Sequence, residues 1–334
     1  MADTLKVDPP GIDAPLVIRA AAQDGKGCTL VDEKQAVQLI NRGRAMIWLD
    51  ILVRDQAAAK EFLSEKLDFH ELAVEDALSE YERPTLQEFR EYLFFSLPAL
   101  FENHGPDQYV EIGFFLKEHA VITVRSQPVR IIDEWFERWR AHPDTMQSSA
   151  AVLLHSIMDG IVDSYFPVVD RMEDEIDELS DAIFSGDTGK VKDILVLKKH
   201  FLEFRRRVAP VRDILNALLR RDLVLVPSDT KPYFQDVLDH VIRISEMLDV
   251  NRETLASLLD VHLSQVSNNL NLVVKKMTVV ATVMMVMTLV AGIYGMNFDY
   301  MPELHWRFGY PFAILLMLVL GGLTLWGFKR SKWL

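Results

Sequence analysis

Short apolar runs separated by polar segments fill residues 27–127, and this pattern predicts a mixed α/β domain. Four of the runs predict strands, at Met46–Val53, Tyr92–Leu100, Tyr109–Leu116 and Ala120–Arg125. The last two runs enclose a short polar turn, so together they predict a β-hairpin. Two segments with helical spacing predict helices, at Ala57–Leu67 and Ala73–Glu80.

Longer helices are predicted from about residue 148 onward, because apolar residues then recur at intervals of three and four. Two arms follow each other along the chain. The first arm is acidic, with nine Asp or Glu residues and a single Arg within 159–181, and the second arm, 190–221, carries clustered basic residues. Two antiparallel arms of opposite charge would form ion pairs along their length. Pro167 and Pro210 predict kinks within them.

One helix of about 60 residues is predicted from Pro232 to Tyr294, because neither Pro nor Gly follows Pro232 until Gly292. The polar half of this helix alone would extend roughly 65 Å at 1.5 Å per residue. A helix of that length, with no other element to cover it, implies packing against copies of itself.

Two uncharged runs near the C-terminus are long enough to cross a membrane. The first has 22 residues, at 277–298, and the second has 21, at 308–328, whereas about 20 apolar residues span the hydrocarbon core. Basic residues flank the pair at 275–276 and 329–332, whereas Arg307 is the only fixed positive charge in the loop between the runs. The positive-inside bias therefore predicts a multi-pass protein of the inner (plasma) membrane with both termini in the cytoplasm.

Charge divides the chain in the same way. Residues 275–334 carry six basic and two acidic side chains, a net charge of +4, within a chain of net charge −13, so 1–274 carry −17. A soluble part that acidic repels nucleic acid. The single cysteine, Cys28, excludes an internal disulfide framework. The first 16 residues lack the pattern of a signal peptide, so we expect the soluble part to stay in the cytoplasm.

A stripe of polar and small residues follows one face of the long helix, at intervals of three and four. Its members are Asp260, Ser264, Ser267, Asn271, Val274, Thr278, Ala281, Met285, Thr288 and Gly292. Two spans per chain cannot enclose water, so an aqueous path requires several copies with these stripes facing a common lumen. Small residues also suit tight helix packing, which is the alternative interpretation of the stripe. Met285 could gate such a lumen by dewetting.

A short motif ends the first span. Gly295-Met296-Asn297 could be no more than a helix C-cap. However, residues 294–304 (YGMNFDYMPEL) resemble the CorA family of magnesium transporters, whose signature is Gly-Met-Asn at the outer end of the first of two C-terminal spans. An acidic loop with Met-Pro-Glu-Leu follows in that family, as Met301-Pro302-Glu303-Leu304 does here. The resemblance extends to the basic ending and to segments 232–237 and 74–76.

The resemblance implies an architecture and a transported ion. The fold class would be an α/β N-terminal cytoplasmic domain, then a long α-helical stalk and two C-terminal transmembrane helices, assembled as a homopentameric funnel. Gly295, Met296 and Asn297 would form the selectivity filter for Mg²⁺, which is both substrate and regulatory ligand, with no organic cofactor. The implied partners are metal ions, membrane lipid and the other subunits of the pentamer.

The same resemblance suggests roles for four carboxylates. Asp299 and Glu303 in the outer loop would raise the local cation concentration, although many family members carry Glu where this chain has Asp299. Asp76 and Asp236 match the regulatory site between neighbouring cytoplasmic domains. Bound Mg²⁺ would bridge them and hold the closed pentamer, and loss of Mg²⁺ would loosen the funnel.

Seven segments are therefore expected. They are a cytoplasmic α/β domain (1–147), an acidic and basic helical hairpin (148–226), a stalk helix (231–276), a first span (277–296), an outer loop (297–308), a second span (309–328) and a basic tail (329–334).

Two alternatives stay open. A zinc transporter of the same architecture is the nearer one, although the intact Gly-Met-Asn favours Mg²⁺, with Co²⁺ and Ni²⁺ as secondary substrates. A membrane-anchored receptor or enzyme is the other, but the sequence shows no catalytic constellation: His70-Glu71 lacks the second His of a metalloprotease helix. The sequence contains no phosphate-binding loop that would couple transport to nucleotide hydrolysis. An inside-negative membrane potential of roughly 100 mV could drive uptake instead, because it would supply about 4.6 kcal/mol per divalent ion.

Overall fold

The computed structural model describes residues 14–24, 27–43, 45–79, 85–101, 109–142, 149–186, 189–299, 301–331 and 333. The chain forms two compact units, and their bounds are Met1–Ser180 with Lys192–Leu255 for the first and Asp181–Val191 with Ala256–Leu334 for the second. Several sequence predictions lie outside the described residues, namely those on 1–13, Glu80, Lys332 and Leu334.

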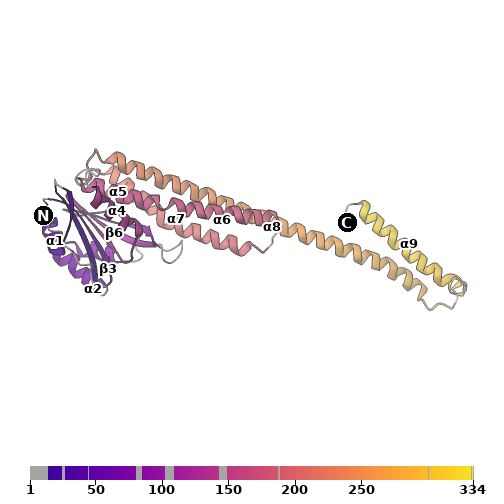
Figure 1. Cartoon of the computed structure of the whole chain (residues 1–334). Coiled ribbons are helices and arrows are strands. Elements are labelled where there is room, and N and C mark those ends of the chain that lie inside the picture. The colour runs from indigo at the N-terminus through magenta and orange to yellow at the C-terminus, as the bar shows by residue number, and fades with distance from the viewer. Residues whose placement is uncertain are drawn as a thin grey trace. The chain divides into compact units, whose positions relative to one another are not determined.

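A seven-stranded sheet in the order β2-β1-β3-β7-β6-β5-β4 lies in the first unit (Figure 1). Its strands are β1 Leu16–Asp24, β2 Gly27–Val31, β3 Met46–Val53, β4 Gln87–Glu88, β5 Leu93–Leu100, β6 Tyr109–Lys117 and β7 Ala120–Arg125. Neighbouring strands are antiparallel except β3 and β7, which pair in parallel. The four predicted strands are confirmed as β3, β5 and the hairpin β6–β7.

Helices cover both faces of this sheet (Figure 1). One face carries α1 Glu33–Arg42, α2 Gln56–Glu61 with its π-helical extension η1 Phe62–Lys66, and α3 Glu71–Leu78; the other carries α4 Arg130–Ala141 and α5 Ala150–Asp163. Side chains alternate along β3, so that Ile47 and Leu49 join the core beneath α1–α3. Trp48 points the other way and its ring centroid lies 5.2 Å from that of Phe136 on α4.

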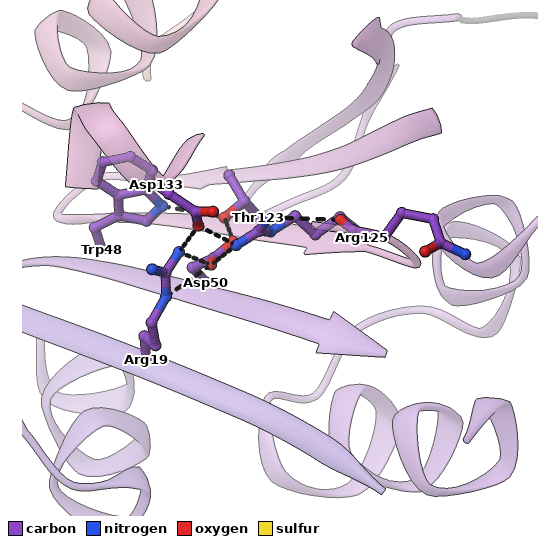
Figure 2. Close-up of polar contacts among 7 residues, drawn as sticks. Arg19, Trp48, Asp50, Thr123, Arg125 and Asp133 are labelled. Atoms are coloured by element: carbon purple, nitrogen blue, oxygen red, sulfur yellow. Dashed lines mark hydrogen bonds and ion pairs between the residues drawn. The ribbon is translucent and has the colours of Figure 1, made fainter. Parts of the chain in front are cut away.

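A buried ion network joins α4 to the sheet (Figure 2). Asp50 on β3 is 1% exposed and accepts hydrogen bonds from Arg19, Arg125 and Thr123, at 2.6–3.2 Å. Asp133 in the first turn of α4 accepts from the same two arginines, at 2.6 and 2.7 Å. Burial opposes the ionisation of Asp50, but Arg125 and Arg19 outweigh it and lower the pKa of this carboxyl. The network therefore stabilises the fold at neutral pH, and that stability is lost as the pH falls through the lowered pKa.

The helical arms follow as α6 Phe166–Phe184 and α7 Val191–Arg220. The kink predicted near Pro167 is a break in the helix, because α5 ends at Asp163 and Pro167 occupies the first turn of α6, where its missing N–H costs nothing. Helix α7 continues through Pro210.

The predicted ion pairing between the two arms was wrong. Among the described residues no ion pair joins an acid of α6 to a base of α7, and the acidic side chains of α6 from Asp170 to Asp181 are exposed. The arms instead bury apolar faces, with Val169 and Ile176 on α6 and Phe201 and Phe204 on α7 at most 3% exposed. Hydrophobic burial therefore holds the arms, and the exposed charges stay solvated.

The predicted long helix is confirmed as α8, Lys231–Tyr294, and α9 spans Gly309–Arg330 after a short 3-10 helix, η4 Pro302–His305. Three stretches of the described chain are long and apolar enough to cross a membrane. The protein itself buries 61% of the stretch in Ala150–Phe184, but only 11% of those in α8 and α9. The first stretch is therefore largely buried in the interior of the protein, and α8 and α9 are the candidate spans.

Replacing Asp50 by Ala should cost about 3–5 kcal/mol of the free energy of unfolding, because it leaves Arg125, which is 3% exposed, without its main partner. Asp133→Ala should cost only about 1 kcal/mol, since Asp133 is 42% exposed. The measurement is urea unfolding of the purified full-length protein followed by tryptophan fluorescence. Equal losses in the two variants would contradict the assigned role of Asp50.

Candidate functional site

The stripe on α8 is uncovered along its whole length. All ten predicted members, from Asp260 to Gly292, are exposed in the single chain. Helix α9 covers a different face, on which Val279 and Val290 are 3% and 5% exposed. On that face a Cβ at Gly321 of α9 would lie 3.0 Å from the Met287 side chain, so the two helices approach closely. At 3.6 residues per turn the two faces lie about 150° apart on α8.

Hydroxyl groups within the stripe keep an acceptor free. Thr278 donates to the carbonyl of Val274 and Thr288 to that of Met284, each at 2.8 Å. A hydroxyl that donates within its own helix retains oxygen lone pairs for a second partner. The stripe thus presents acceptor oxygens to whatever it faces, with Met285, which is 69% exposed, between the two threonines.

The Gly-Met-Asn segment continues directly from the last turn of α8. The amide of Gly295 donates to the carbonyls of Ala291 and Gly292, at 2.9 and 3.2 Å, and that of Met296 to Ile293, at 3.3 Å. Gly295 is not in the left-handed conformation that the usual glycine C-cap adopts, so the C-cap alternative does not account for it. Asn297 is exposed, and its side chain forms no hydrogen bond with the described residues.

The outer loop returns to α9 through η4. Gly309 lies so close to the carbonyl of Glu303 that a Cβ there would clash with it. The Nδ1 atom of His305 lies 3.2 Å from the carbonyl oxygen of Met301. Asp299 and Glu303 are both exposed, as their predicted role requires.

The two predicted regulatory carboxylates lie apart within one chain. Asp76 on α3 accepts a hydrogen bond from Gln87 and is half-buried. Asp236 near the start of α8 is exposed and lies close to α5. Burial lowers the pKa of His155 on α5, and the negative charge of Asp236 opposes that shift. Since α3 and α5 cover opposite faces of the sheet, one ion cannot bridge Asp76 and Asp236 of the same chain.

A group of three side chains with the spacing of metal ligands, which the sequence analysis missed, lies beside Asp236. It consists of Asp159 and Asp163 on α5 and His240 on α8, whose ligand atoms lie within 4.8 Å of one another. The Nδ1 atom of His240 is 3.8 Å from Asp159 and 3.2 Å from Asp163. Burial, Asp163 and Asp236 raise the pKa of Asp159, and His240 opposes them. Neither Asp159 Oδ1 nor His240 Nδ1 has a hydrogen-bond partner, although both atoms are buried.

A signal for this cluster was present in the sequence. Asp159 and Asp163 are four residues apart, as are Asp236 and His240, so each pair shares one face of its helix. The sequence analysis counted both aspartates only as part of an acidic arm, because nothing in the sequence places α5 beside α8. One His and several carboxylates form a mixed nitrogen and oxygen ligand set that suits a divalent cation.

Comparisons with known proteins agree with this architecture. Residues 43–330 match a family described as CorA-like Mg²⁺ transporter protein. The chain is 34% identical to a cobalt/magnesium transport protein CorA of Thermotoga maritima, over 86% of this chain and 83% of that one. It superposes with a TM-score of 0.82 and 25% identity on the complete CorA magnesium transporter of Methanocaldococcus jannaschii, over 95% and 98% of the two chains. A ZntB cytoplasmic domain from Vibrio parahaemolyticus shares the fold, with a TM-score of 0.62 and 16% identity over 75% and 98%.

Replacing His240 by Ala should weaken Co²⁺ binding by at least about 10-fold and Mg²⁺ binding much less, because imidazole suits Co²⁺ whereas Mg²⁺ prefers oxygen ligands. Isothermal titration of the purified protein with each ion measures both affinities. His305→Ala, which removes an exposed histidine of the outer loop, is the control. Unchanged Co²⁺ affinity in the His240 variant would show that the cluster binds no metal.

Proposed function

The chain belongs to the CorA family of magnesium and cobalt transporters, and from this premise we propose that it carries Mg²⁺, with Co²⁺ and Ni²⁺ as secondary substrates, through a pore shared by several copies. The family consists of ion transporters and not of enzymes. One observation carries the proposal. The stripe from Asp260 to Gly292 is exposed along its whole length, on the side of α8 that α9 leaves free.

Several copies are needed because α8 and α9 of one chain cannot enclose an aqueous path. We take the homopentamer that the resemblance implies as the assembly. In it the stripes would face a common lumen, with Thr278 and Thr288 offering acceptor oxygens to a hydrated ion. Helix α9, whose face toward α8 includes the small residues Ala313 and Gly321, would face lipid on its other sides.

The outer filter would be a ring formed by Gly295, Met296 and Asn297 of each subunit. Mg²⁺ loses its water reluctantly, so a filter that hydrogen-bonds the hydrated ion is better suited than one that strips it. The Asn297 side chain is free of bonds to the described residues of its own chain, which supports this role. Neutral ligands hold the ion loosely enough for release. Asp299 and Glu303 would concentrate cations at the entrance.

The driving force would be the membrane potential. With both termini in the cytoplasm of an inner (plasma) membrane protein, the filter faces outward and the acidic cytoplasmic part faces inward. A divalent ion gains about 4.6 kcal/mol in crossing roughly 100 mV toward the negative side. Uptake then needs no organic cofactor.

Cytoplasmic Mg²⁺ would inhibit its own uptake. Asp76 of one subunit and Asp236 of its neighbour would share a bound ion, which is consistent with their separation within a single chain. The cluster of Asp159, Asp163 and His240 adds a further ligand set beside Asp236. When cytoplasmic Mg²⁺ falls, the carboxylates repel one another and the closed assembly loosens.

A zinc transporter is the second candidate, because a ZntB cytoplasmic domain shares the fold. That likeness is confined to the cytoplasmic part and to the fold, whereas the Gly-Met-Asn triplet at 295–297 favours Mg²⁺. Flux into liposomes that contain the purified protein, with Mg²⁺, Co²⁺, Ni²⁺ and Zn²⁺ compared side by side, decides between the two.

Replacing Asn297 by Ala should abolish Mg²⁺ flux into liposomes, because the filter loses its side-chain oxygens, and should leave the oligomer intact. Asn268→Ala is the matched control, since Asn268 lies on α8 outside the stripe. Size-exclusion chromatography with light scattering checks the assembly. Flux at the wild-type rate in the Asn297 variant would refute the filter.

Replacing Asp236 by Ala should raise the cytoplasmic Mg²⁺ concentration that half-inhibits flux, by about 10-fold or more, as expected for the loss of a metal ligand. Asp239→Ala, an exposed aspartate on the same helix, should leave that concentration unchanged. If the Asp236 variant is inhibited at the wild-type Mg²⁺ concentration, Asp236 has no part in sensing.

A further inference from the structure

Glu111 on β6 is a partly buried carboxylate that the proposed ion pathway does not use. Its Oε2 atom is buried and has no hydrogen-bond partner among the described residues. Arg207 on α7 lies near enough for its positive charge to act on Glu111, yet among the described residues no ion pair or hydrogen bond joins the two side chains. A buried carboxylate without hydrogen bonds is costly when it is ionised. Burial raises the pKa of Glu111 to about 7, with Arg207 opposing it.

Aromatic side chains surround this position. The guanidinium carbon of Arg207 lies 4.9 Å from the centroid of the Tyr109 ring, a cation–π contact. Phe204, one turn earlier on α7, lies 5.8 Å from the same ring. In the pairing of β5 with β6, Glu111 lies opposite Pro98, whose carbonyl accepts a hydrogen bond from the fully buried Tyr165.

These contacts form the joint between the sheet and α7. The titratable or charged groups that act on Glu111 or around it are Arg207 from α7, Tyr165 from the turn between α5 and α6, and Tyr109 from β6 itself. Of these only Arg207 carries a positive charge. Its guanidinium now lies on the Tyr109 ring, but the flexible side chain has a second possible partner in Glu111.

We propose that Glu111 and Arg207 form a proton-operated switch at the joint between the sheet and α7. With the proton bound, Glu111 is neutral and Arg207 stacks on Tyr109. When the proton leaves to water, the carboxylate attracts the guanidinium, and Arg207 exchanges the ring for a charge-assisted hydrogen bond. Because the titration lies near neutral pH, both states are populated over the cytoplasmic range.

An ion pair connects this part of α7 to α8. Arg205, two residues before Arg207, forms an ion pair with Asp249 of α8 at 2.8 Å. A shift of α7 on deprotonation would therefore act on the helix that continues toward the candidate pore. We expect the Mg²⁺ concentration for half-inhibition to change between about pH 6 and about pH 8. This consequence rests on the proposed function, whereas the switch itself does not.

The first test is infrared difference spectroscopy of the full-length protein in lipid nanodiscs. Between about pH 6 and about pH 8, the wild type should lose a protonated-carboxyl band with a midpoint near neutral pH. Glu111→Gln should lack that band, and the control Glu118→Gln, an exposed glutamate of the same hairpin, should keep it. A band that survives in Glu111→Gln, or its absence from the wild type, overturns the switch.

The second test is thermal unfolding against pH. The folded protein holds the Glu111 proton more tightly than the unfolded chain, so the stability of the wild type should fall from about pH 4.5 to about pH 7 and then level off. Arg207→Gln should move the infrared midpoint to higher pH, because the opposing cation is gone. This variant keeps the switch testable if Glu111→Gln fails to fold. An unmoved midpoint in Arg207→Gln overturns the pairing.

The third test measures Mg²⁺ inhibition of flux at the two pH values. Wild type should show a shift in the half-inhibiting concentration, and Glu111→Gln should show none. An inhibition that is independent of pH in the wild type overturns the coupling to α8. An absence of Mg²⁺ flux in the wild type at either pH overturns the proposed function instead, and the first two tests still decide on the switch.

Discussion

A membrane helix that carries hydroxyl and amide groups along one side cannot leave that side in hydrocarbon, because each polar group without a partner there is costly. One side of α8 is covered by α9, and there Val279 and Val290 are buried. The opposite side, with Thr278 and Thr288, has no cover within the chain. This uncovered side of α8 is the reason for our proposal that several copies of the chain assemble around a shared pore.

The first unit contains buried polar groups of two kinds. Asp50 lies in the interior of the first unit, and two arginines and a threonine satisfy it completely. Asp159 and His240 in the same unit are left with buried atoms that have no hydrogen-bond partner. The satisfied charges at Asp50 hold strands and helices in place, whereas the atoms at Asp159 and His240 belong to a group of side chains with the spacing of metal ligands.

The sequence was sufficient to predict a strand or helix wherever the periodicity of its apolar residues was clear. The apolar runs of β3, β5 and the β6–β7 hairpin, and the unbroken helical pattern of α8, predicted the elements that the structure contains. Strand β1 was missed because Ala20, Ala21 and Ala22 give neither alternation nor a strong preference for strands. The cluster at His240 was missed because it depends on two helices meeting, which no local pattern reveals. The predicted ion pairs between the α6 and α7 arms were wrong, because exposed ion pairs contribute little to the free energy of folding and do not determine how helices pack. The roles of Asn297, Asp76 and Asp236 and the exact domain limits stay predictions.

The unbroken course of α8 has a mechanical consequence. With 64 residues it is about 96 Å long, and it contains neither Pro nor Gly between Tyr233 and Ala291 to act as a flexible joint. A rod of that length behaves as a lever: a tilt of about one degree at its first turn displaces its last turn by roughly 1.7 Å.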